Sequence, residues 1–190
     1  MTVTHPADPI ELRSSYRFDA IEARARRLPP RGQLRIVSGI AKPVSAAAYS
    51  PTLLFSSLLH APHYHELVLA HYALPASGKH GPFNVADLAP ADFREIDPQT
   101  LIRRTSRHLE YRRYGAPAIA PALVRRTEDL IVGFAARPFL VYALAPCEAF
   151  SRPDNSTHPH EWSHALLEFH EYVLFDRRRH ALACMMFAFD

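Results

Sequence analysis

The sequence predicts an α+β protein with a mainly helical body and a small antiparallel sheet that includes a C-terminal hairpin. Between about residues 14 and 137, prolines divide the chain into short segments whose apolar residues recur at helical spacing. From about residue 139 to residue 190, aromatic and β-branched residues predominate and alternate. A chain of 190 residues that is 48% hydrophobic is expected to form a single domain over residues 1–190.

Capping residues and prolines predict where the helices and the strand of the helical body begin and end. Ser14 and Ser15 can cap a helix over about 16–28, which Pro29 would end. Ser50 followed by Pro51 is a typical helix start. The expected elements after the first helix are a strand over 33–37 and helices over about 51–59, 62–74, 97–114 and 121–137.

The C-terminal region is expected to form strands. Residues 139–143 are apolar and β-capable and could pair with a closing hairpin, whose arms precede and follow the turn at residues 176–180. Both arms are apolar on both faces, so the hairpin either lies inside a sheet or offers an edge to which an extended peptide could add as a strand. The predicted peptide-binding residues on this edge are Tyr172, Leu174, Met185 and Phe187.

The same segment has a second interpretation as a zinc-binding helix. His160, His164 and His170 reproduce the H-E-x-x-H-x5-H spacing of metzincin proteases, with Glu161 as the general base. Leu167 stands where those proteases have the glycine that lets the third histidine turn back, and a continuous helix would direct His170 away from the other two. We therefore favour the strand and expect neither a metal nor a catalytic residue on this chain. A zinc-dependent metallohydrolase is the alternative.

Composition narrows the possible classes of function. Two cysteines, no long apolar run and no signal-peptide pattern predict a cytoplasmic protein without a membrane partner. Arginine supplies nearly all of the 22 basic residues. Nucleic-acid binding is not expected, because acidic residues are interleaved with the arginines and no aromatic RNA-binding motif accompanies them. The predicted contacts to a partner or an acidic peptide are Arg103, Arg107, Arg112 and Arg113.

The size and order of several segments resemble those of a known protein family. The segments are residues 67–72, leading into 81–83, then 91–96, 108–111 and the closing hairpin. Over roughly two thirds of the chain, this layout resembles the MbnC family of methanobactin biosynthesis partner subunits. The resemblance implies a heterodimer with an iron-dependent enzyme that converts a precursor-peptide cysteine into an oxazolone and a thioamide. This subunit would bind the leader peptide, and the iron would stay on the partner. A small immunity or inhibitor protein is a further alternative.

Overall fold

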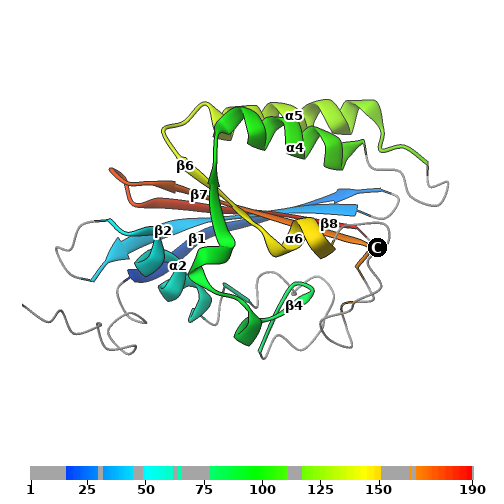
Figure 1. Ribbon diagram of the computed structural model, residues 1–190. Coiled ribbons are helices and arrows are strands. Elements are labelled where there is room, and N and C mark those ends of the chain that lie inside the picture. The colour runs from blue at the N-terminus through cyan, green and yellow to red at the C-terminus, as the bar shows by residue number, and fades with distance from the viewer. Residues whose placement is uncertain are drawn as a thin grey trace, which may run out of the picture.

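A six-stranded antiparallel sheet forms the centre of the molecule (Figure 1). The computed structural model describes residues 16–29, 32–44, 49–61, 64–65, 78–110, 117–150, 163 and 166–189, with the backbone alone for residues 20–23. The strands lie in the order β1–β2–β8–β7–β6–β5. Their bounds are β1 Tyr16–Leu28, β2 Gly32–Pro43, β5 Phe93–Ile96, β6 Leu140–Leu144, β7 Glu168–Asp176 and β8 Ala181–Phe189.

The expectation of a mainly helical body with a small sheet is wrong. Three of the six strands, β1, β2 and β5, come from the part of the chain that was expected to be the helical body. The largest error is the predicted helix over 16–28, which is the 13-residue strand β1 paired with β2 along its whole length. The alanines and arginines of β1 favour a helix by only tenths of a kcal/mol per residue, about the scale that tertiary pairing overrides.

A β-bulge in β1 lets this one strand contribute to both sides of the sheet. The register with β2 shifts between Ala20 and Glu22. An extra residue in a strand moves every later side chain to the opposite face. Tyr16 accordingly packs in the core on one side of the sheet, whereas Leu28 packs in the core on the other side.

Helices cover both faces of the sheet (Figure 1). On one face lie α4 (Pro98–Leu109) and α5 (Pro121–Ala135). The other face is covered by α2 (Pro51–Leu59), α6 (Pro146–Phe150) and the short hairpin of β3 (Lys79–His80) and β4 (Phe83–Asn84). Two 3-10 turns, Val85–Asp87 and Pro90–Asp92, lead from β4 into β5.

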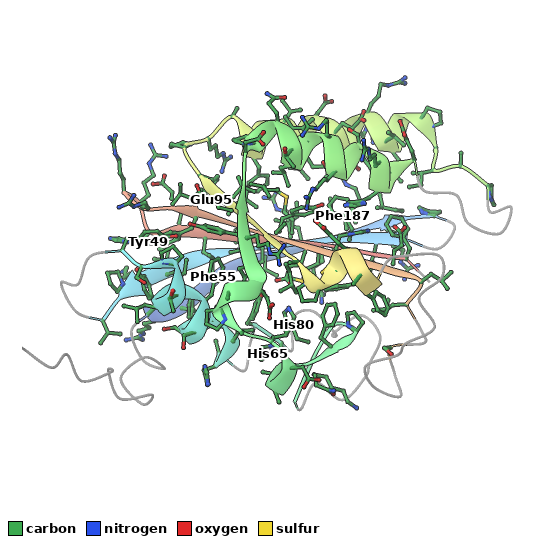
Figure 2. All side chains as sticks on the ribbon, viewed as in Figure 1. Tyr49, Phe55, His65, His80, Glu95 and Phe187 are labelled. Atoms are coloured by element: carbon green, nitrogen blue, oxygen red, sulfur yellow. The ribbon has the colours of Figure 1, made fainter. Side chains whose placement is uncertain are left out.

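The two coverings explain why the C-terminal hairpin is apolar on both faces. Phe169 and Phe175 of β7 pack in the core between the sheet and α2. Leu174 of β7 and Phe187 of β8 pack in the core under α4 and α5. Figure 2 shows Phe55 and Phe187 on opposite sides of the sheet. The hairpin is therefore the centre of the molecule.

Several local predictions are confirmed. The strand after Gly32, the helices that begin at Pro51 and Pro121, and the pairing of the strand at 140–144 with the hairpin all occur. Side chains of Ser50 and Asp97 cap α2 and α4, as helix-start signals require. The helix predicted over 97–114 ends at Leu109. Of the helix predicted over 62–74, only residues 64–65 lie in the described part of the chain. Within the described residues, no helix is long and apolar enough to cross a membrane.

Candidate functional site

The residues predicted to bind a peptide do not lie on an edge. Tyr172, Leu174, Met185 and Phe187 are all buried under α4 and α5. Strand β8 pairs with β2 as well as β7, and β7 pairs with β6 as well as β8. At these four positions each strand of the hairpin is paired on both sides, so the residues lie inside the sheet and not at the edge on which the prediction rested.

The structure tests only one residue of the predicted zinc set. His160, Glu161 and His164 lie outside the described residues. His170 lies on strand β7, which supports the strand interpretation at that position. Its neighbours are Glu168, whose Oε2 atom is 3.3 Å from His170 Nε2, and His108 of α4, whose ring stacks on that of His170 at 3.6 Å.

The predicted arginine contacts are partly described. Arg103 and Arg107 are exposed on α4, and Arg103 donates a hydrogen bond of 2.6 Å to the Thr100 hydroxyl. Arg112 and Arg113 lie outside the described residues. Whether α4 contacts a partner stays a prediction.

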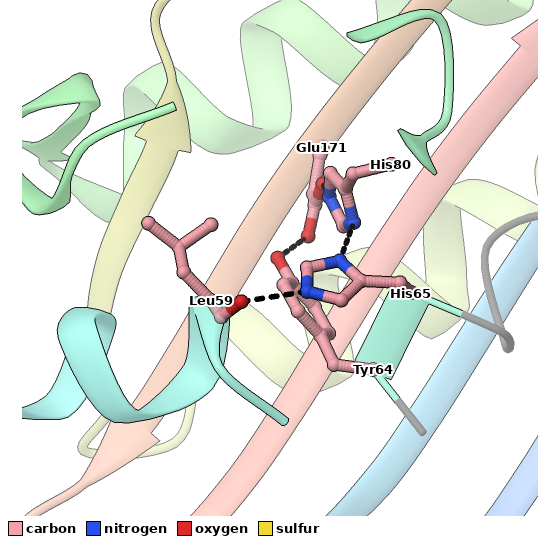
Figure 3. Close-up of polar contacts among 5 residues, drawn as sticks. All are labelled: Leu59, Tyr64, His65, His80 and Glu171. Carbon is pink, nitrogen blue, oxygen red and sulfur yellow. Dashed lines mark hydrogen bonds and ion pairs between the residues drawn. The ribbon is translucent and has the colours of Figure 1, made fainter. Parts of the chain in front are cut away.

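A buried polar network on the α2 side was missed from the sequence (Figure 3). Glu171 of β7 accepts a hydrogen bond from the Tyr64 hydroxyl through Oε1, and its Oε2 atom lies 2.5 Å from His80 Nε2. His80 Nδ1 lies 3.0 Å from His65 Nδ1, and His65 Nε2 lies 2.7 Å from the Leu59 carbonyl oxygen. Every member of the network is at most 7% exposed.

The Leu59 carbonyl oxygen, at one end of this hydrogen-bond network, determines where the protons of the network lie. A carbonyl oxygen only accepts, so His65 must donate from Nε2 to Leu59. Burial, followed by the neighbouring His80, lowers the pKa of His65, which is therefore neutral with a lone pair on Nδ1. His80 must then donate from Nδ1. One further proton lies between His80 Nε2 and Glu171 Oε2, so the pair carries no net charge in either arrangement.

This network links segments that are far apart in sequence, because it joins β7 to β3 and to residues 64–65. Each of the polar atoms named above has a hydrogen-bond partner. Burial and the Glu171 carboxylate raise the pKa of the Tyr64 hydroxyl well above its ordinary value, so Tyr64 stays protonated. A carboxylate within the apolar run of β7 was the available signal for a buried partner.

Both cysteines lie in the same core. Cys147 and Cys184 are free and buried, and burial followed by Glu171 raises the pKa of each thiol well above its ordinary value. Their thiols stay protonated at neutral pH and are poor nucleophiles. They are accordingly packing residues.

A second polar cluster lies on the opposite face of β7, under α4. His108 Nε2 is 2.8 Å from the Tyr172 hydroxyl, and burial lowers the pKa of His108 well below its ordinary value, with smaller effects from His170 and Arg104. Nitrogen or oxygen atoms of His108, Glu168 and His170 all lie within 4.8 Å of one another. Two imidazoles and a carboxylate form a donor set that divalent transition metals accept.

The outer strands of the sheet are β1 and β5, and β1 is much the longer. Within the described residues, no strand pairs with the outer side of β1. Its sequence carries four arginines against Asp19 and Glu22, a net charge of 4 − 2 = +2. The arginines are Arg17, Arg24, Arg26 and Arg27.

A pocket opens at the Tyr16 end of β1. It has a volume of about 480 Å³ and is lined by Tyr16, Tyr49, Phe175, Arg177 and Arg178, together with Pro43 and His180. The Tyr49 and Phe175 rings stack with their centroids 5.3 Å apart, and the Arg177 guanidinium lies 4.8 Å from the Tyr49 ring centroid. An aromatic floor with two arginines suits a carboxylate or an aromatic side chain.

Comparison of the chain with known protein families, with curated proteins and with solved structures gives no match. The resemblance to the methanobactin partner subunits therefore stays a prediction.

Proposed function

We propose that this chain is a non-catalytic binding subunit that takes up an extended acidic peptide as an added strand along β1. The observation that carries the proposal is the long outer side of β1, which no described strand covers. An unpaired strand edge presents backbone N–H and C=O groups that bind a guest strand, and side-chain contacts then select the sequence.

Charge favours an acidic guest over a second copy of the same strand. Three of the four arginines of β1 lie between Arg24 and Leu28, and that segment contains no acidic residue. Two such edges would repel each other, whereas glutamates on a guest strand would face guanidinium groups. The bulge and the arginines thus protect β1 from pairing with itself and leave it open to an oppositely charged partner.

The pocket at the start of β1 would hold one end of the guest. A peptide that follows β1 to Tyr16 reaches the aromatic floor formed by Tyr49 and Phe175. Arg177 and Arg178 supply positive charge there for an acidic side chain or a terminal carboxylate.

The larger assembly is proposed on the resemblance alone. The guest would be a precursor leader peptide, and the partner would be an iron-dependent peptide-modifying enzyme that carries the iron. A cytoplasmic location fits the two free thiols. Coexpression with a neighbouring enzyme gene and copurification test this part. Recovery of the chain alone, with no enzyme bound, would contradict the heterodimer.

A peptide titration tests binding at β1. The probe is a labelled 12-residue peptide in which Glu alternates with Val, and the reference peptide has Gln in place of Glu. We expect fluorescence anisotropy to show binding of the Glu peptide that weakens with added salt and is lost when alternate backbone nitrogens are methylated. Failure of the Glu peptide to bind at low salt would overturn the proposal.

Two charge reversals locate the binding surface. Arg27→Glu alters the exposed end of β1, and Arg107→Glu is the matched change on the exposed face of α4. We expect Arg27→Glu to weaken binding by about tenfold and Arg107→Glu to leave it unchanged. The opposite pattern would place the peptide on α4 instead of β1.

A further inference from the structure

The cluster under α4 combines three metal-binding side chains from two elements. Glu168 and His170 are two positions apart on β7, so their side chains point to the same face of the sheet. His108 reaches them from α4. The side chains of His170 and Glu168 are 13% and 12% exposed, so an ion from solution could reach them.

The donors are close enough to converge on one ion. Their atoms lie within 4.8 Å of one another, and His170 Nε2 is already 3.3 Å from Glu168 Oε2. A metal with bonds of about 2.1 Å needs donors roughly 3 to 3.5 Å apart. The two rings are stacked at an interplanar angle of 14°, so binding requires the imidazoles to tilt until their lone pairs meet.

The surroundings supply what a metal-binding histidine needs. His108 Nε2 lies 2.8 Å from the Tyr172 hydroxyl, which can accept its N–H and leave the Nδ1 lone pair for an ion. The nearby cation Arg104 is paired with Glu148 at 2.6 Å, which offsets its repulsion of a metal. Tyr172 would then fix the tautomer and orientation of the His108 ring.

We propose that His108, Glu168 and His170 form a binding site for one divalent transition metal of the zinc or cobalt class. Three protein donors leave at least one coordination position open for water or another ligand. This site shares only His170 with the set expected from the H-E-x-x-H spacing. It lies on the opposite face of β7 from the Glu171 network, and it does not depend on peptide binding at β1.

Cobalt titration of the full chain tests the proposal. The protein is prepared without a histidine tag, treated with a chelator and titrated with Co²⁺ alone, while visible absorption and calorimetry are recorded. We expect one equivalent of Co²⁺, with absorption bands that Zn²⁺ abolishes by displacement. A protein that binds no metal under these conditions would overturn the site.

Variants separate this site from the other histidines. We expect His170→Gln and Glu168→Gln each to weaken Co²⁺ binding at least tenfold, and Tyr172→Phe to weaken it by about tenfold or more. The control His60→Gln changes an exposed histidine at the end of α2 and should have no effect. Far-UV circular dichroism confirms folding, and Glu168→Gln is nearly isosteric. Unchanged binding in His170→Gln or Glu168→Gln would contradict the site. Loss of binding in the double variant His160→Gln/His164→Gln would contradict it as well, because the ion would then use the zinc-protease spacing.

Discussion

At the residue scale, one carboxylate ties the centre of the sheet to the segments packed on it. Glu171 is 1% exposed and contacts both Tyr64 and His80. An ionised carboxylate in this core would be costly without a partner, and the shared proton with His80 makes the pair neutral as a unit. The network is stable because each of its donors meets an acceptor.

Two substitutions of Glu171 test the proposed positions of the protons in this network. In Glu171→Gln, the amide oxygen can accept from Tyr64 while the amide nitrogen donates to His80 Nε2, so we expect a loss of about 1 kcal/mol. Glu171→Ala removes both contacts and leaves a cavity, so we expect a loss of about 3 to 5 kcal/mol. Urea unfolding measures both values. Equal losses in the two variants would show that the hydrogen-bond pattern is wrong.

Gly81 offers a second test at this scale. Its φ is +55°, and a Cβ there would lie 2.7 Å from the Phe169 ring. We expect Gly81→Ala to reduce the free energy of unfolding by about 2 kcal/mol, because backbone strain and overpacking add. Gly133→Ala is the matched control in α5, where a Cβ meets nothing within 4 Å, and it should stabilise the protein by up to about 1 kcal/mol. Thermal unfolding measures the stability of both variants against the parent protein. A Gly81→Ala variant as stable as the parent protein would contradict the packing of β3 and β4 on β7.

At the element scale, local signals predicted helices better than strands. Prolines with Ser50 or Asp97 before them predicted where α2 and α4 begin, because capping depends on neighbouring residues alone. Strand β1 was missed because its Ala-Arg pattern is compatible with a helix until β2 pairs with it. The position of the hairpin, inside the sheet or at its edge, could not be decided from the sequence, because strand order depends on contacts that are distant in sequence.

The same limit applies to the candidate sites. His80 and Glu171 are 91 residues apart, and His108 and Tyr172 are 64 apart. No spacing rule relates such positions in one sequence. The H-E-x-x-H spacing was visible because it is local, yet it drew attention away from His108 and Glu168. A charged residue inside an apolar strand was the only local sign of either cluster.

Amide hydrogen exchange tests the arrangement of the strands in the free protein. We expect β8 and residues 172–175 of β7 to exchange only through global unfolding, because both are paired on two sides and buried. Amides of β1 that point away from β2, called outward amides below, should exchange far faster than the amides of β1 that are hydrogen-bonded to β2. Slow exchange along both sides of β1 would show that another segment already covers this edge.

At the scale of the whole molecule, the sheet has two separate cores held by opposite sets of helices. Leu54 and Phe55 of α2 pack in one core, and Leu101 of α4 and Ile131 of α5 pack in the other. A sheet buried on both faces leaves its outer strands as the places where a guest backbone can add. The proposed peptide binding is therefore expected at an outer strand, and β1 is the longer of the two.

Global stability should depend on pH in part through His65. Burial lowers its pKa in the folded protein, so between that value and the unfolded value of about 6.5 the unfolded chain binds more protons. The free energy of unfolding should be constant above about pH 6.5 and fall as the pH decreases below it. Urea midpoints at pH 7.5 and 5.5 measure the fall, which should be smaller in His65→Gln. An equal fall in the variant would exclude His65 as the cause.

The proposed addition of an acidic peptide to the outer side of β1 can be followed by amide hydrogen exchange in the presence of the Glu-Val peptide. We predict that saturating peptide slows exchange of the outward amides of β1 and leaves α4 and β5 unchanged. Protection confined to α4 or β5, or no protection of β1 at saturation, would show that the peptide does not add to β1.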